Sequence, residues 1–173
     1  MKRPLLLGLV LLVALVPSAS AGVSGRDGAT TFYAHVFPVD GPHWTRGAIG
    51  EFGAPRSGGR THEGFDIVAA CRTPLVAVAT GRVLRVGYDP VLYGNYLLIH
   101  GQGEQRSYFY AHMIRPAAVD RGDRVWAGER VGSIGETGNA RTVGCHLHFE
   151  SHVHGHPIDP EPALDNWDAR PDL

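Results

Sequence analysis

The residues of this chain best suited to chemistry are histidines and one aspartate in three short stretches. They are His62 and Asp66 in HEGFD, His112 in YAHM, and His146 and His148 in GCHLHFE. Neutral imidazole and carboxylate groups are good zinc ligands, and histidine is also a common acid–base group in enzymes. These residue types together predict a zinc site with acid–base groups beside it.

The spacing within each stretch decides which side chains can converge. In a β-strand, residues i and i+2 face the same side, so His146 and His148 point into one space. Gly64 argues against a helix between His62 and Asp66, and in extended backbone these two residues also share a face. A catalytic zinc usually takes three protein ligands and leaves a position for water, so the surplus histidines can act as acid–base groups. Each pattern alone is more typical of a polar strand face or of a satisfied pair of polar side chains than of a metal site.

The stretch HEGFD begins like the helical zinc motif H-E-x-x-H, but it does not complete it. Its fifth residue is Asp66, where that motif has histidine. We therefore predict that Glu63 is a solvent-facing loop residue and not the general base of a helical zinc site.

The elements that position these residues are predicted to be short, antiparallel β-strands. Strands are expected at 31–39, 64–68, 94–101, 106–113 and 146–153, the third and fourth as a hairpin and the last followed by a turn at His154-Gly155. The segments 74–89 and 123–136 each resemble two strands joined by a tight turn. Segment 43–61 is rich in glycine, proline and arginine and is predicted to be a long surface loop. A sustained helical period is missing, apart from a possible short turn near 162–168.

The first 21 residues are predicted to be a signal peptide. Lys2 and Arg3 precede an apolar run from Leu5 to Val16, which is shorter than the ~20 residues of a membrane-spanning helix. Ala-Ser-Ala at 19–21 fits a signal-peptidase site; an uncleaved N-terminal anchor is the alternative. We expect a secreted protein of the cell wall or periplasm, without a stable membrane partner once the signal is removed. The predicted organisation is a signal peptide (1–21), a lead-in (22–35), a single catalytic domain (36–164) and a polar tail (165–173).

Charge and composition exclude several classes of function. The formal net charge is −1, which leaves no basic footprint for nucleic acid. Segment 123–136 resembles the hairpin that carries biotin or lipoate in carrier domains. These cofactors are attached through a lysine, and Lys2 is the only lysine of the chain, so a carrier domain is excluded. A cysteine peptidase using Cys145 and His146 is also disfavoured, because neighbours in a strand point to opposite faces.

The motifs occur in an order that resembles a known family. GGRTHEGFDIVA, GNYLLIHG, SYFYAHM, GDRVWAGERVGSIGETGNA, GCHLHFE and GHPIDPEPAL follow one another between about Val36 and Leu164. This chain resembles the lysostaphin/LytM-type zinc endopeptidases of metallopeptidase family 23, which hydrolyse peptide bonds in bacterial peptidoglycan. The resemblance implies a mostly β, barrel-sandwich-like core of antiparallel sheets with long surface loops. It also implies one Zn²⁺ per chain, a peptidoglycan peptide as substrate and a monomer.

The resemblance also assigns roles to residues. It implies that His62, Asp66 and His148 are the zinc ligands and that His112 and His146 are catalytic. Family members that bind peptidoglycan or activate amidases without cutting usually lack ligands. All five positions are filled here, so an active enzyme is expected and a non-catalytic LytM-like domain is the alternative.

Two cysteines stand where the family usually has other residues. Cys71 lies five residues after Asp66, and Cys145 directly precedes His146. If both flank one metal site, they can form a disulfide that ties the two ligand-bearing segments together. Two free thiols, or thiolate zinc ligands, are the alternatives.

Positions can also be predicted for several polar residues outside the five main ones. We expect Glu150 either to accept a hydrogen bond from a ligand imidazole or to face solvent. Asn95 is expected to order a loop beside the cleft. His152, His154 and His156 continue the parity of His148 and are expected to be polar residues along an exposed strand and turn, with weak metal binding near the strand end as the alternative. His35, His43 and His100 are expected in loops or sheets. Whether the loop 43–61 covers the groove stays open at this level.

Overall fold

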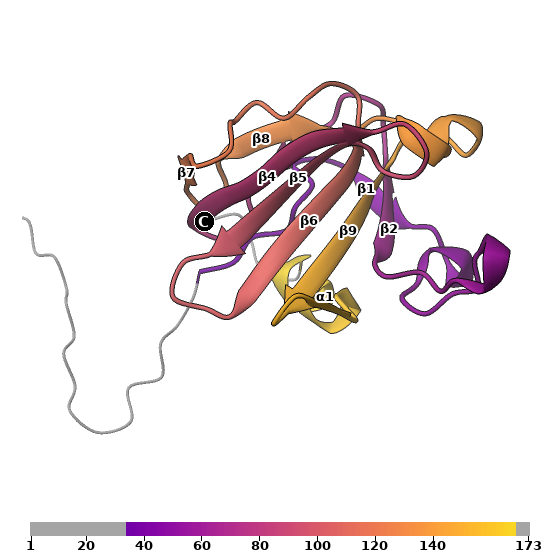
Figure 1. The fold of residues 1–173 in the computed structure, drawn as a ribbon, viewed down its shortest axis with the longest axis horizontal. Coiled ribbons are helices and arrows are strands. Elements are labelled where there is room, and N and C mark those ends of the chain that lie inside the picture. The colour runs from indigo at the N-terminus through magenta and orange to yellow at the C-terminus, as the bar shows by residue number, and fades with distance from the viewer. Residues whose placement is uncertain (1–33, 169–173) are drawn as a thin grey trace, which may run out of the picture. The chain divides into compact units, whose positions relative to one another are not determined.

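Antiparallel strands dominate the structure, a computed structural model that describes residues 34–168 (Figure 1). The strands are β1 (His43–Thr45), β2 (Phe65–Ala69), β3 (Pro74–Val76), β4 (Gly81–Asp89), β5 (Gly94–Gly101), β6 (Arg106–Met113), β7 (Arg124–Val125), β8 (Arg130–Ser133), β9 (His146–Val153) and β10 (His156–Ile158). The helices are three short 3₁₀ turns, η1 (Ala48–Gly50), η2 (Ser57–Gly59) and η3 (Gly138–Thr142), and the α-helix α1 (Glu161–Asp168). The predicted mostly-β class is confirmed. No helix in residues 34–168 is long and apolar enough to cross a membrane.

Most strands belong to one large sheet with the order β1-β2-β9-β6-β5-β4-β7, and β10 pairs with the end of β9. β3 and β8 form a separate two-stranded sheet. Every pairing is antiparallel. β9 lies between β2 and β6, so the two predicted ligand stretches, HEGFD and GCHLHFE, are neighbours in the sheet.

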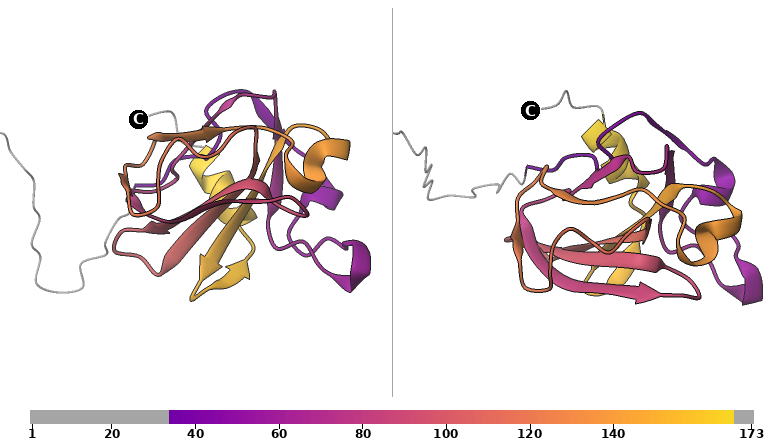
Figure 2. Two further views of the ribbon diagram at one scale, coloured as in Figure 1. Left: turned by 45° about the horizontal axis from the view of Figure 1, so that its top comes forward. Right: turned by 90° about the horizontal axis from the view of Figure 1, so that it is seen from above.

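The hydrophobic core lies against one face of the large sheet. On β9, Leu147 and Phe149 enter the core, whereas His146 and His148, which alternate with them, face the other way. α1 covers this core face (Figure 2), and its Trp167 packs edge-on against Phe149, with 6.4 Å between ring centroids. Burial of each such large side chain contributes roughly 1.5–3 kcal/mol. The packed core thus extends past residue 164, into the segment expected to be a polar tail.

Two predicted hairpins are wrong in their pairing. Segments 74–89 and 123–136 do contain two strands each, but the two strands of a segment do not pair with one another. β3 pairs with β8 in the small sheet, while β4 pairs with β5 and β7 in the large sheet. The tight turns at Thr80-Gly81 and Ala127-Gly128 therefore carry the chain from one sheet to the other.

The N-terminal part of the described chain also differs from the prediction. Of the strand expected at 31–39, residues 31–33 lie outside the described residues, and the rest forms only isolated bridges, His35 to Ala79 and Val39 to Leu75. Pro38 has no N–H to contribute to a ladder. Segment 43–61 is not one irregular loop, because it contains β1 and the 3₁₀ turns η1 and η2.

Candidate metal centre

The three predicted metal ligands come together because β2 and β9 are paired. Asp66 and His148 are direct cross-strand partners, so their side chains leave the same face of the sheet. His62 precedes β2 and is held by backbone hydrogen bonds with Ala54 and Gly53. Gly64 lets this segment pass close to β9, since a Cβ there would lie 2.5 Å from the carbonyl oxygen of Phe149.

The donor atoms of these three side chains form a compact triangle. His62 Nε2 lies 2.8 Å from His148 Nδ1, and Asp66 Oδ1 lies 3.1 Å from His62 Nε2 and 3.2 Å from His148 Nδ1. Tetrahedral zinc with bonds of about 2.0–2.1 Å separates its donors by about 3.3 Å. All three side chains are buried. Both the donor types and their separations therefore fit a zinc ion.

The outer nitrogen of each ligand histidine has its own hydrogen-bond acceptor. His62 Nδ1 lies 2.9 Å from the carbonyl oxygen of Glu51. His148 Nε2 lies 2.7 Å from Glu150 Oε1, and the second oxygen of Glu150 lies 2.6 Å from His152 Nε2. A donor proton on the outer nitrogen leaves the inner nitrogen free for a metal. Of the two expectations for Glu150, the buried hydrogen-bond acceptor is the one that the structure shows.

The electrostatics of the cluster favour a bound cation. Burial opposes ionisation of Asp66, but hydrogen bonds from His148 and His62 hold its pKa well below the usual range. Burial likewise opposes protonation of His148, but its hydrogen bonds with Asp66 and Glu150 raise its pKa to about 9. This site thus stabilises a positive charge at His148 Nδ1, where a metal would replace the proton.

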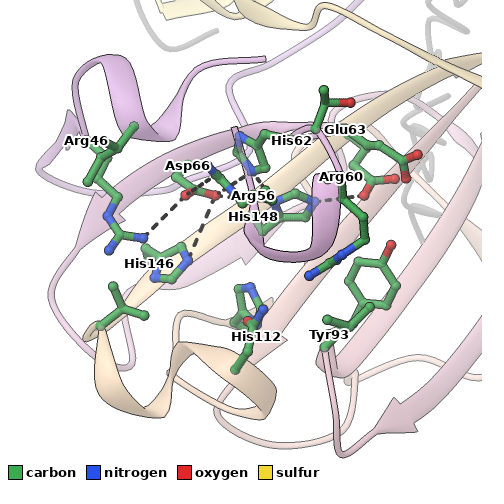
Figure 3. A pocket seen from close by; sticks show the side chains of 17 residues that line it. Arg46, Arg56, Arg60, His62, Glu63, Asp66, Tyr93, His112, His146 and His148 are labelled. Atoms are coloured by element: carbon green, nitrogen blue, oxygen red, sulfur yellow. Dashed lines mark hydrogen bonds and ion pairs between the residues drawn. The ribbon is translucent and has the colours of Figure 1, made fainter. Parts of the chain in front are cut away.

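His146 and His112 lie beside the triangle and face the same space (Figure 3). The two rings are 4.8 Å apart between centroids, and His146 Nε2 lies 3.9 Å from Asp66 Oδ1. His146 reaches this face through the regular alternation of β9. His112 does not, because Tyr108 and Tyr110 of the same strand point into the core.

A bulge in β6 turns His112 toward the site. Ala111 and His112 lie between paired positions where β5 has only Tyr96. His112 adopts φ 65°, a left-handed conformation that is uncommon outside glycine. Bulges often redirect side chains beside active sites. The period-2 pattern in the sequence gives no sign of this extra residue.

Both of these histidines are held neutral with one nitrogen toward the site. His112 Nδ1 lies 2.9 Å from the carbonyl oxygen of Thr137, and His146 Nδ1 lies 2.8 Å from that of Gly144. Carbonyl oxygens only accept, so the Nδ1 atoms carry the protons and the Nε2 atoms are free acceptors. Burial lowers the pKa of His112 to about 3 and also lowers that of His146.

A groove of about 610 Å³ opens over these residues. Sequence reasoning missed several groups in its walls, namely Arg46, Arg56, Arg60 and Tyr93. Burial and nearby acids raise the pKa of Tyr93 to about 12, which keeps its hydroxyl protonated. No local pattern marks these side chains, because the arginines come from segment 43–61 and Tyr93 from the link between β4 and β5, and only the fold brings the two segments to one groove.

The remaining assignments can be compared with the structure directly. Cys71 and Cys145 form a disulfide, with 5.3 Å between Cα atoms, so the two thiol alternatives are wrong. Asn95 donates from Nδ2 to the carbonyl oxygen of Met113, the last residue of β6, so its role in ordering a loop stays a prediction. Glu63 is exposed, as predicted. The turn at His154-Gly155 is present, joining β9 to β10.

A comparison with known protein families identifies the family of this chain. Residues 60–160 match the model of peptidase family M23. The chain belongs to peptidase family M23. The matched range contains all five candidate site residues and both half-cystines of the disulfide.

Named relatives of this M23 chain are longer proteins. It is 36% identical over 102 residues to the DD-carboxypeptidase/endopeptidase Mpg of Neisseria meningitidis, covering 58% of this chain and 22% of that protein. It is also 32% identical over 112 residues to the lipoprotein NlpD/LppB homolog of Pseudomonas aeruginosa, covering 65% of this chain and 35% of that protein. The chain thus spans about a fifth to a third of the length of these relatives.

Solved structures of M23 peptidases share the fold. A zinc-containing peptidase from Vibrio cholerae superposes with a TM-score of 0.64 at 28% identity, covering 81% of this chain and 40% of that one. The catalytic domain of lysostaphin from Staphylococcus simulans superposes with a TM-score of 0.60 at 28% identity, covering 67% of this chain and 89% of that one. The LytM-type core expected from the sequence is confirmed.

Proposed function

We propose that this chain is a zinc-dependent endopeptidase that hydrolyses peptide bonds of bacterial peptidoglycan. One observation carries the proposal. In an M23 chain, the triangle of His62, Asp66 and His148 lies in one groove with two neutral histidines whose free nitrogens face it. The substrate class is supported by the DD-endopeptidase activity in the names of relatives.

His62, Asp66 and His148 would hold one zinc ion per chain through Nε2, Oδ1 and Nδ1. Zinc supplies Lewis acidity toward a carbonyl and lowers the pKa of water to near neutrality. Glu51 and Glu150 fix the ligand rings from outside, the first through its backbone carbonyl and the second through its carboxylate.

His146 and His112 would move the protons of the hydrolysis. Each is neutral and can accept a proton at Nε2, because its Nδ1 proton is already donated to a backbone carbonyl. A protonated Nε2 can then donate to the developing oxyanion or to the leaving amine. A positioned acid–base group typically contributes ~10²–10⁴-fold in rate.

The alternative is a non-catalytic, peptidoglycan-binding or amidase-activating role. The similarity to a protein named as an NlpD/LppB lipoprotein keeps this alternative open. The complete set of ligands and both free Nε2 atoms support the enzyme, since a binding domain needs neither.

Digestion of defined muropeptides, with products identified by mass spectrometry, tests the proposal. We expect new amine termini with the zinc-loaded protein, their loss with EDTA and their return with added zinc. Alkylating reagents should have no effect, because both cysteines are in the disulfide. Binding of muropeptides without any new amine terminus would instead establish the non-catalytic role.

The export of this chain and its monomeric state are part of the same proposal. Residues 1–21, the expected signal peptide, lie outside the described residues. The disulfide between Cys71 and Cys145 supports an oxidising compartment such as the periplasm or the cell exterior.

A further inference from the structure

Three arginines from one segment line the groove beside the candidate metal ligands. They are Arg46, Arg56 and Arg60, which all come from the stretch between β1 and β2. The side chains of Arg46 and Arg56 are 21% and 27% exposed, and Arg60 is exposed. Figure 3 shows Arg60 on the side of Tyr93 and His112, and Arg46 on the opposite side of the cluster.

These guanidinium groups have little negative charge to balance them. Arg46 and Arg56 lie 3.3 and 3.6 Å from the same atom, Asp66 Oδ2. The Nε of Arg60 donates to the carbonyl oxygen of Ser57. In residues 34–168, Asp66 is the one acid in ion-pair contact with any of the three arginines.

Asp66 cannot neutralise this positive charge once it serves the metal. Its Oδ1 belongs to the ligand triangle, so a bound cation would take up the same carboxylate that faces the arginines. Of the other acids lining the groove, Glu150 is committed to His148 and His152, and Glu63 makes no ion pair within the described chain. Burial lowers the pKa of Arg56, the charge of Asp66 opposes this, and the neighbouring charges of Arg46 and Arg60 add smaller lowering contributions.

The groove also has apolar lining residues. Leu92 and Val143 are two of them, and Val143 is 47% exposed. A peptide bound in this groove can therefore place an anionic side chain at the arginines and its apolar parts against these residues. Arginine suits this purpose, because its planar fork binds a carboxylate through two parallel hydrogen bonds.

We propose that Arg56 and Arg60 bind a free carboxylate of the substrate next to the scissile bond, so that the groove prefers an acidic peptide over the same peptide with a neutral side chain. The inference rests on the proposed function and specifies the substrate class of the same groove. Arg46 hydrogen-bonds Asp66 and is a positioning residue for that ligand.

A matched pair of peptides tests this selectivity. Both contain one stem-type peptide bond for cleavage, and they differ only in one acidic side chain, which is a carboxylate in one and the isosteric carboxamide in the other. Binding is measured by calorimetry on the zinc-loaded His112→Ala variant, which keeps all three ligands, and kcat/KM is measured on the zinc-loaded wild type. We expect the carboxylate peptide to be favoured about tenfold in both measurements, in the range of charge-assisted hydrogen bonds.

Substitutions locate the selectivity on the arginines. Arg60→Gln alone, and together with Arg56→Gln, should bring the two peptides to within about twofold of each other. The selectivity is taken as the ratio between the two peptides for each variant, with its zinc content measured beside it, so that a general loss of activity or of metal does not count as a loss of selectivity. Arg121→Gln, at an exposed position that does not line the groove, is the matched control and should keep the full preference.

The outcomes separate this inference from the proposed function. Equal binding and cleavage of the two peptides by the proteins with intact arginines would overturn the arginine assignment while leaving the endopeptidase proposal in place. An undiminished preference in the Arg56→Gln/Arg60→Gln protein would also overturn it. A tenfold binding preference without cleavage of either peptide would support the carboxylate site and count against the enzyme.

Discussion

β9 and β6 are adjacent strands that bring histidines to the same groove by different means. β9 uses the plain alternation of a strand, so that His146 and His148 face the groove while Leu147 and Phe149 face the core. β6 needs a bulge and a left-handed residue at His112. The comparison shows that ligand geometry built on a regular strand can be read from spacing, whereas a side chain that departs from the alternation requires the three-dimensional structure.

The largest effect is expected from His148→Ala, which removes a groove-facing histidine of the regular strand β9. Removal of a ligand should abolish cleavage. It should also lower zinc affinity by more than the ~100-fold that can follow loss of a residue hydrogen-bonded to a ligand. Zinc content by mass spectrometry of the native protein and muropeptide digestion measure the two effects. Retention of one zinc per chain would contradict the ligand assignment.

The corresponding substitution in β6, His112→Ala, should lower the rate of catalysis without lowering metal binding. We expect kcat to fall by ~10²–10⁴-fold at unchanged zinc content, because His112 is not part of the triangle. His146→Ala is the matched variant, since it removes the other free Nε2 from the regular strand. A loss of zinc in His112→Ala would show that the bulge serves the metal instead of the proton transfer.

A smaller effect is expected from Glu150→Ala, which keeps the strand but removes the acceptor that orients His148. Loss of such a hydrogen bond typically lowers metal affinity by ~10–100-fold. Competition with a zinc chelator measures this change. His152→Ala, which leaves the bond between His148 and Glu150 intact, should cost much less, and equal losses in the two variants would argue against a specific orienting role.

The smallest effect on activity is expected from Cys71→Ser combined with Cys145→Ser. Loss of the disulfide should lower the free energy of unfolding by about 2–4 kcal/mol in the chain-entropy model, while the folded site keeps its ladder between β2 and β9. Urea unfolding of the zinc-free protein measures the change. An unaltered unfolding midpoint would mean that the strand pairing alone holds these segments together.

The contrast between β9 and β6 also explains which elements could be predicted from the sequence and which could not. The strands β5, β6 and β9 lie where they were predicted, and the alternation along β9 correctly grouped His146 with His148. The partners of β3 and β7 were missed because non-local pairing depends on contacts that a local pattern does not encode. The helix α1 was underestimated, since it is one short element whose stability comes from packing Leu164 and Trp167 on the sheet.

The groove walls were missed for a related physical reason. Arg46, Arg56 and Arg60 lie in a glycine- and proline-rich stretch with no periodicity, so nothing in the sequence shows which way they point. Arg46 and Arg56 meet at Asp66 because β1 pairs with β2 and the 3₁₀ turns lie between these strands, while Arg60 donates to the carbonyl oxygen of Ser57. Surface arginines in a loop are ordinarily solvated, and only the fold brings all three to one groove.

The link between Cys71 and Cys145 has a consequence for the order of events during folding. The two half-cystines are separated by 74 residues in sequence, so in the reduced, unfolded chain Asp66 and His148 meet rarely. Oxidation makes them near neighbours before any sheet has formed, which raises their effective concentration for one another. A chelating pair would then exist early, and metal capture could guide the folding of the groove instead of waiting for it.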